Sequence, residues 1–208
     1  MESVSYAEMA LADVLDAFSS TDAVPGGGSA AALAGAIGTS LLLMVARLPN
    51  TKSGAPEETA DLAETSSRLR PLRDWLLELV DRDSDAYAKV MEAFRLAKDS
   101  DAGKAARRQA IDRATRIATE APLDTMRACQ QALRGAVVVA ANGSRRATSD
   151  VGVAVELLLA ALHGARLNVE INLSTLDDAA YAARVKTEVV ELERHAAVDA
   201  DTARRALR

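Results

Sequence analysis

The sequence predicts an all-α protein, a single-domain bundle of long helices that kink at internal prolines. Apolar residues recur at intervals of three and four along almost all of the 208 residues, which is the helical period. No segment alternates β-branched and polar residues between tight turns, as a strand would. Hydrophobic residues make up 49% of the chain but aromatic residues only 3%. The core must therefore consist mainly of Ala, Leu and Val, which let helices approach closely.

Turn and capping signals divide this pattern into six predicted helices within one domain, residues 1–208. Pro71 is expected to kink the third helix and Pro122 to interrupt the fourth, because proline has no backbone donor. The last helix is expected to open at Ser174, with Asp177 in the capping-box position. The predicted helices cover about residues 6–18, 29–48, 57–96, 104–139, 149–173 and from 174 onward.

The composition excludes several classes of function. The formal net charge of −5 and the pI near 5.2 give no general attraction for phosphate backbones, so nucleic acid is not an expected partner. Cys129 is the only cysteine and the chain has two histidines, so we expect no metal site. A single cysteine and an acidic N-terminus without an export signal predict a cytoplasmic protein.

One long uncharged run, residues 30–46, needs a separate interpretation. It falls just short of the usual membrane-spanning length and is diluted by small and polar residues. We therefore expect a buried helix and no membrane association. Gly35 and Gly38 within it are expected to allow close helix packing.

Three consecutive glycines precede this helix, in the segment Pro25-Gly26-Gly27-Gly28-Ser29. Without side chains, their backbone N–H groups can point at a ligand, and the helix dipole behind them favours negative charge or a carbonyl oxygen. The glycines could equally serve only to turn the chain, with Ser29 as the helix cap. The spacing favours neither interpretation. The segment is neither a P-loop nor a dinucleotide fingerprint.

Asp83 interrupts an apolar stripe on the third predicted helix. The stripe runs through Leu76 and Leu79 and resumes at Tyr87, and Asp83 occupies the position where the next core residue belongs. A desolvated carboxylate has a raised pKa or needs a cationic partner. Acid–base chemistry is one explanation, and pairing with an arginine is the other, which the pattern alone slightly favours. Asp81 and Asp85 beside it are expected to face solvent.

Polar residues also mark the two ends of the fifth predicted helix. Asn168 and Asn172 are four residues apart, so both amides project from one face. They could bind the edge of a heterocycle or tie neighbouring helix backbones together. Ser149 and Asp150 stand at the other end, where an N-cap is the simple explanation. Asp150 precedes Asn168 by eighteen residues, roughly 27 Å along the axis, so only a dimer or a long ligand could join these ends in one site.

Taken together, these residues resemble the cyclodeaminase/cyclohydrolase family, which includes the C-terminal domain of formimidoyltransferase-cyclodeaminase and stand-alone methenyltetrahydrofolate cyclohydrolases. The similarity extends from about residue 7 to 185, and its specificity lies in the order and spacing of several short blocks. These blocks are Pro25-Gly26-Gly27-Gly28-Ser29, Met44-Val45-Ala46, Asp83-x-x-Ala86-Tyr87, Lys98, Ala121-Pro122-Leu123, Ser149-Asp150-Val151-Gly152-Val153-Ala154, Asn168-Val169-x-x-Asn172 and Asp178.

The resemblance implies an all-helical homodimer that acts on a tetrahydrofolate substrate without a metal or redox cofactor. It implies catalytic roles for Asp83, Lys98 and Asp150. Substrate-binding roles would fall to Gly26, Gly27, Gly28, Ser29, Lys52, Tyr87, Ser149, Asn168, Asn172 and Asp178. The chain departs from the family pattern between Pro49 and Gly54, where it keeps one lysine, and at Ala97, where relatives have proline.

The leading hypothesis is hydrolysis of 5,10-methenyltetrahydrofolate to 10-formyltetrahydrofolate. In this reaction a carboxylate such as Asp83 could stabilise the cationic carbon and accept a proton from water. In cyclodeamination ammonia leaves, and Lys98 or Lys52 could be the acid for the departing nitrogen or could bind the glutamate tail of the folate. The alternatives are a formimidoyltetrahydrofolate cyclodeaminase that releases ammonia, and a non-catalytic helical dimer that binds folate or another metabolite.

Overall fold

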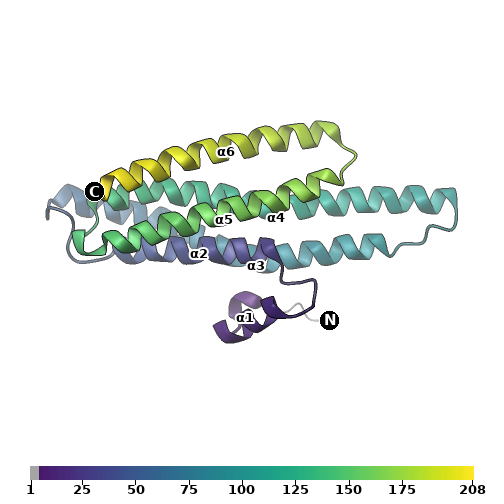
Figure 1. Cartoon of the computed structure of the whole chain (residues 1–208), viewed down its shortest axis with the longest axis horizontal. Helices are drawn as coiled ribbons and strands as arrows, with labels where there is room; N and C mark the ends of the chain where they lie inside the picture. The colour runs from purple at the N-terminus through teal and green to yellow at the C-terminus, as the bar shows by residue number, and fades with distance from the viewer. Residues whose placement is uncertain (1–4) are drawn as a thin grey trace.

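The computed structural model describes residues 5–208, and most of them are helical (Figure 1). The only extended pairing within these residues is an isolated bridge between Thr51 and Gly143, which confirms the all-α prediction. Residues 1–4 lie outside the described residues, and with them the acidic N-terminus from which we predicted that the chain has no export signal. The helices are α1 (Leu11–Ser19), α2 (Gly27–Ala46), α3 (Pro56–Phe94), α4 (Asp101–Asn142), α5 (Thr148–Ser174) and α6 (Ala179–Ala206), with short 3-10 turns at Tyr6–Glu8 and Arg145–Ala147.

Helix α2 packs against α3, α4 and α5. Two glycines allow this close approach, as predicted. A Cβ on Gly35 would lie 2.9 Å from the Cys129 sulfur, and one on Gly38 would lie 3.0 Å from the Ala154 carbonyl oxygen. Among the described helices, α2 alone is long and apolar enough to cross a membrane, and 61% of its most apolar window is buried inside the bundle.

Helix α4 continues without a break through Pro122, so the predicted interruption is wrong. The proline ring leaves the carbonyl of Ala118, four residues earlier, without its helical donor. The side-chain amide of Asn172 on α5 donates to this oxygen at 3.0 Å. A tertiary contact therefore replaces the missing backbone bond, and the helix continues.

Three helix ends, two of α5 and one of α6, differ from the prediction. Helix α6 begins at Ala179, and its cap is Asp178, which accepts the Tyr181 backbone N–H at 2.9 Å. Ser174 instead ends α5 and donates to the Ile171 carbonyl oxygen. Ser149 does not cap α5, because the helix already starts at Thr148. The local capping patterns predicted the helix boundaries to within a few residues. Which polar residue caps each helix depends on how the helices pack.

The predicted first helix is divided, and its second part, α1, stands away from the bundle (Figure 1). Both sides of α1 are held in place. Before it, the Ser5 hydroxyl and the Tyr6 backbone N–H each donate to Asp81 at 2.7 Å. After it, the chain enters α2 at Gly26. Asp81 is thus a structural anchor, contrary to the prediction that it faces solvent, and only Val14 of α1 is buried.

Candidate active site

A cleft of about 340 Å³ lies where α2 begins. Helices α3, α4 and α5 extend past the N-terminus of α2, so its first residues form one end of the cleft. The lining residues come from these four helices and from the segment before α2. They are Ala23, Val24, Gly26, Gly27, Asp83, Tyr87, Val90, Phe94, Thr115, Ala118, Asn168, Ile171, Asn172 and Thr175.

The carboxylate of Asp83 lies against the N-terminus of α2. A Cβ on Gly28 would come within 2.2 Å of Asp83 Oδ1 and 2.5 Å of its carboxyl carbon. Only glycine therefore leaves room for the carboxylate at this position. This contact joins the first two features that the sequence singled out, the glycine segment and the interrupted stripe.

Ser29 supports Asp83 from behind and is itself fully buried, so it does not line the cleft. Its hydroxyl oxygen lies 2.8 Å from the Val80 carbonyl oxygen and 3.2 Å from Asp83 Oδ2. It does not cap α2 through its side chain, since the N-cap position belongs to Gly26. The structure thus places Ser29 as a support for the carboxylate, away from the surface that a substrate can touch.

Burial raises the pKa of the Asp83 carboxyl above its ordinary value, and hydrogen bonds from the hydroxyl and backbone N–H of Ser29 oppose that rise. Among the described residues, no Lys, Arg or His lines the cleft, and Tyr87 is the only other titratable residue on its walls. The arginine-paired alternative for Asp83 is therefore wrong. A carboxyl that is desolvated and has no cation beside it is suited to proton transfer or to binding a cationic ligand.

The two asparagines lie on the α5 wall of the cleft, and both alternatives predicted for them contribute. The amide nitrogen of Asn168 donates to the Gly164 carbonyl oxygen at 3.0 Å, and that of Asn172 to Ala118. The backbone contacts use one donor of each amide. Within residues 5–208 no donor is paired with either side-chain oxygen, so the cleft offers two amide acceptors for a ligand.

The opposite wall is formed by the end of the apolar stripe on α3. Tyr87 and Phe94 remain 40% and 44% exposed because no further helix covers this end of α3. Arg107 of α4 fixes the wall, since its guanidinium donates twice to the Phe94 carbonyl oxygen and lies 5.4 Å from the ring centre. The local pattern of Phe94, an apolar residue at helical spacing from Tyr87, is that of a core residue and does not mark it as part of a site. Thr115 also lines the cleft and was not predicted, because nothing in its local pattern differs from other buried threonines.

Lys98 does not line this cleft. It lies in a neighbouring hollow of about 320 Å³ that shares Thr175 with the cleft and contains three further cationic side chains, Lys104, Arg107 and Arg108. Asp178 lies outside both hollows, where it caps α6 and pairs with Arg116.

Three other predicted site residues, Lys52, Ser149 and Asp150, lie at the far end of α2. The Lys52 backbone N–H donates to the Asn142 carbonyl oxygen at 2.8 Å, and its ammonium group donates to Ala206 at 3.0 Å. Ser149 and Asp150 belong to the first turn of α5. Within one chain the structure therefore does not bring these residues together with Asp83, as the helical distance predicted.

The bundle, with a largely buried carboxylate that faces a cleft at a glycine-lined helix start, has the fold of a cyclodeaminase. The crystal structure of formiminotetrahydrofolate cyclodeaminase from Thermotoga maritima superposes with a TM-score of 0.87 over 96% of each chain, at 23% sequence identity. A family model described as formiminotransferase-cyclodeaminase matches residues 10–191. The chain belongs to this family.

Named relatives divide between two activities. The chain is 40% identical over 168 residues to methenyltetrahydrofolate cyclohydrolase from Methylorubrum extorquens, a match that covers 81% of both chains. It is 29% identical over 170 residues to formimidoyltransferase-cyclodeaminase from Gallus gallus. That match covers 82% of this chain but only 31% of the chicken protein. The chain thus corresponds to about a third of the bifunctional protein and to most of the cyclohydrolase.

Proposed function

We propose that this protein is an enzyme that hydrolyses 5,10-methenyltetrahydrofolate to 10-formyltetrahydrofolate. The observation that carries the proposal is Asp83, a desolvated carboxyl group that faces a cleft whose walls contain no Lys, Arg or His from residues 5–208. The methenyl substrate is a cation at the reacting carbon, and such a site favours its binding. Similarity to the Methylorubrum cyclohydrolase over most of both chains supports this choice of reaction.

Asp83 acts as the general base in the proposed mechanism. The oxygen of a water molecule attacks the carbon that bridges N5 and N10, and one proton of the water passes to the carboxylate. The bond from this carbon to N5 then breaks, and N5 takes up the proton that Asp83 received, which restores the carboxylate. The second proton of the water is released as the formyl carbonyl forms. Ionised Asp83 stabilises the cation before attack, and its raised pKa suits it to receive the proton.

The walls of the cleft suggest how the substrate lies. The two free amide oxygens of Asn168 and Asn172 can accept hydrogen bonds from the pterin edge, and the exposed rings of Tyr87 and Phe94 provide aromatic surface. The glutamate carboxylates would then extend toward the cationic hollow that contains Lys98. Lys98 is therefore proposed to bind the tail and not to act as the acid.

Cyclodeamination is the second candidate, because the animal relatives that match this chain are formimidoyltransferase-cyclodeaminases. A spectroscopic assay separates the candidates. Loss of the methenyl absorbance means hydrolysis, and its appearance from formimino-folate means cyclodeamination. Folate binding without either change would identify a non-catalytic binding protein and overturn the proposal.

We further propose that the reaction needs no metal or redox cofactor, since water attack on a cationic carbon requires only a base. Activity should persist after dialysis against a strong chelator, and loss of activity that added metal restores would contradict this. The protein is also proposed to act in the cytoplasm and as a homodimer. The free thiol of Cys129 supports the first, and an uncovered apolar side of α2 supports the second.

A further inference from the structure

The Ser29 hydroxyl has one proton and three polar neighbours. Its oxygen lies 2.8 Å from the Val80 carbonyl oxygen, 3.2 Å from Asp83 Oδ2 and 3.2 Å from the Ser84 hydroxyl oxygen. A hydroxyl donates one hydrogen bond and can accept two. The proton of Ser29 can therefore point at Val80 or at Asp83, but not at both.

The charge of Asp83 decides which of the two positions is favoured. When the carboxylate is ionised, Oδ2 is the stronger acceptor, and the Ser29 hydroxyl turns to it in spite of the longer distance. When the carboxyl is protonated, this advantage is lost, and the Ser29 proton turns to the nearer Val80 carbonyl oxygen. The Ser29 oxygen can then accept the carboxyl proton if that proton is on Oδ2. Ser29 is fully buried, so these are the acceptors its proton can choose between.

Ser84 extends this contact away from the cleft. It is 7% exposed and does not line the cleft, and within residues 5–208 its hydroxyl has only Ser29 as a hydrogen-bond partner. When the Ser29 proton points at Asp83, Ser84 can donate to the Ser29 oxygen, which gives a chain of donors that ends on the carboxylate. The members of such a chain polarise and strengthen one another, and a bond to a charged acceptor is the strongest kind. Ser84 can therefore stabilise the charge of Asp83 without touching it.

We propose that Ser29 and Ser84 form a hydroxyl pair that follows the charge of Asp83: both hydroxyls turn toward the carboxylate when it is ionised and away from it when it is protonated. The inference rests on the proposed function, in which Asp83 takes one proton from water and passes it to N5. No proton leaves either serine, since each hydroxyl only turns about its C–O bond. Both are positioning residues, because neither lines the cleft.

The pair meets a requirement of the mechanism. Asp83 must be ionised before water attacks and protonated afterwards, although it is largely buried. A fixed cation beside it would hold the carboxylate ionised but would also oppose the uptake of a proton. Hydroxyls that turn stabilise the charge while it is present and find another acceptor once it is gone. They therefore keep the base available without making it too weak to accept a proton.

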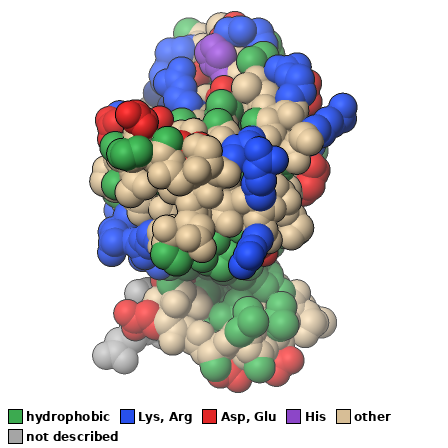
Figure 2. Space-filling model, turned by 90° about the vertical axis from the view of Figure 1, so that its left-hand side faces the viewer, with side chains coloured by type: hydrophobic (Ala, Val, Ile, Leu, Met, Phe, Trp, Pro, Cys, Tyr) green, Lys and Arg blue, Asp and Glu red, His purple; other side chains and the backbone are tan. Residues whose placement is uncertain are grey.

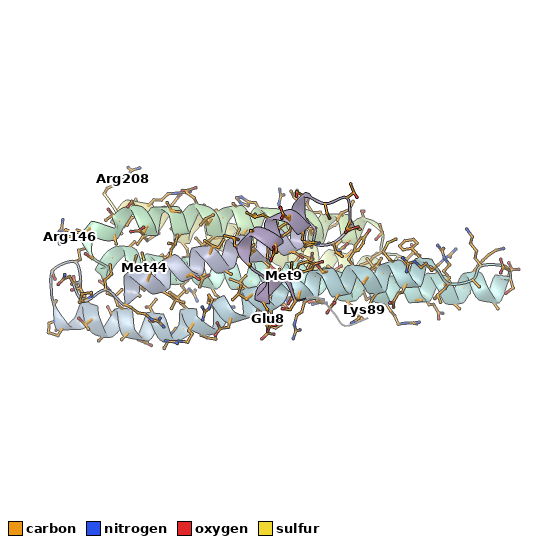
Figure 3. All side chains as sticks on the ribbon, turned by 90° about the horizontal axis from the view of Figure 1, so that it is seen from below. Glu8, Met9, Met44, Lys89, Arg146 and Arg208 are labelled. Carbon is orange, nitrogen blue, oxygen red and sulfur yellow. The ribbon has the colours of Figure 1, made fainter. Side chains whose placement is uncertain are left out.

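Among the described residues, no charged side chain takes over this role. Helix α2 has no charged residue, and the α4 and α5 residues that line the cleft are uncharged, so Tyr87 of α3 is the only other titratable group on its walls. Asp81 accepts hydrogen bonds from the N-terminal segment. A separate hollow between α3 and α4 contains Arg82, Asp85 and Lys89, and Figure 3 shows Lys89 at the edge of the bundle. Figure 2 shows Lys and Arg side chains gathered over the end of the bundle where α2 ends, at the other end of this helix from Ser29.

Titration of Asp83 tests the pair without any enzymatic assay. Carbon-13 NMR follows the aspartate carboxyl carbons, and the signal of Asp83 is the one missing from Asp83→Asn. In Ser29→Ala the pKa of Asp83 should rise, because the carboxylate loses a donor that the neutral acid does not need. In Ser84→Ala it should rise by less, although Ser84 does not touch Asp83. The matched control is Ser66→Ala, a buried serine of the same helix beside Arg47, and it should leave the titration of Asp83 unchanged.

The double variant Ser29→Ala/Ser84→Ala distinguishes a connected pair from two separate effects. Ser84 acts only through Ser29, so the double variant should titrate like Ser29→Ala alone. Ser29→Cys keeps the size of the side chain with a weak donor, so its pKa for Asp83 should lie between wild type and Ser29→Ala, and it carries the test if Ser29→Ala does not fold. An unchanged pKa of Asp83 in the Ser29 variants, or effects of the two substitutions that simply add, overturns the pair.

The pH dependence of kcat/KM connects the pair to the reaction. Its acid limb reports the ionisation of the base in the free enzyme, so the limb should move to higher pH in Ser29→Ala and, by less, in Ser84→Ala. On the acid side of the limb we expect kcat/KM to fall about tenfold in Ser29→Ala and about threefold in Ser84→Ala. An equal loss at every pH would mean that the serines only support the structure, and it overturns the inference. An inactive wild type overturns the proposed function alone, because the titration still decides the pair.

Discussion

Asp83 and Asp178 are both carboxylates that the sequence assigned to the site, and they lie in opposite surroundings. Asp83 joins α3 to the start of α2, and among the described residues Ser29 is its only side-chain partner and no Lys, Arg or His lines the cleft beside it. Asp178 lies at the contact of α4 and α6, where it caps a helix and pairs with Arg116. A carboxylate such as Asp178, whose hydrogen-bond and ion-pair partners belong to the protein, stabilises the fold. A carboxylate without a cationic partner, such as Asp83, remains available to a ligand.

The α4–α6 contact contains a network of further carboxylates that are paired with side chains of the protein. Arg127 donates to Glu188 at 2.6 Å and to Asp124 at 2.7 Å, and it also contacts Glu120. Glu188, and after it Asp124, raise the pKa of the guanidinium. The Tyr181 hydroxyl donates to Glu120 at 2.8 Å. Substitutions in the two regions should therefore act on different properties of the protein.

The largest expected effect is that of Asp83→Asn on turnover. The amide keeps the shape but removes the base, so turnover should fall by roughly two orders of magnitude. Stability should change in the other direction. Because burial raises the pKa of Asp83, the ionised form destabilises the fold, and this penalty is absent below about pH 4 and grows as pH rises. The variant should melt above wild type at pH 8 and level with it at pH 4. Unchanged turnover would show that Asp83 is not the base.

Gly28→Ala should come next, since its methyl group would displace the Asp83 carboxylate. We expect activity to fall strongly and the free energy of unfolding to fall by about 1–3 kcal/mol from overpacking. The matched control is Gly27→Ala, whose Cβ would lie 3.6 Å from Asn168, an ordinary contact. Turnover and urea unfolding measure both effects. Equal losses in the two variants would mean that the glycine segment acts by flexibility and not by making room for Asp83.

Arg127→Met should affect only the fold. The Arg127 side chain is about one-third exposed and contacts three carboxylates, all of which lose this partner. We expect the free energy of unfolding to fall by roughly 1–3 kcal/mol. Thermal unfolding would detect this loss. Turnover per folded molecule should match wild type, and a loss of turnover would break the contrast between the two regions.

The smallest expected effect is that of Asp178→Ala, which removes the cap of α6 and the pair with Arg116. A lost N-cap costs about 1 kcal/mol, measurable by chemical denaturation. The Michaelis constant should stay at its wild-type value, because Asp178 does not line the cleft. A raised Michaelis constant with unchanged stability would restore the substrate-binding role that the family resemblance implied.

The sequence by itself determined the helices, the buried position of α2 and the unusual place of Asp83. These follow from the spacing of apolar residues and from the steric demands of glycine, which act over a few neighbouring residues. The separation of Asp150 from Asn168 was also predictable from the sequence, because the helix rise alone sets that distance. It could not predict that Gly28 leaves room for Asp83, since these residues are 55 positions apart.

Only the tertiary structure decided which polar groups are satisfied by the protein. Pro122 was expected to interrupt α4, yet the amide of Asn172 replaces the missing donor at Ala118, and the helix continues. Asp83 and Asp178 were both expected in the site, but Arg116 pairs with Asp178 and neutralises it. Hydrogen bonds and ion pairs of this kind join residues far apart in the chain. Local patterns therefore predict where a polar residue stands, but only the packed structure determines whether it is left free for chemistry.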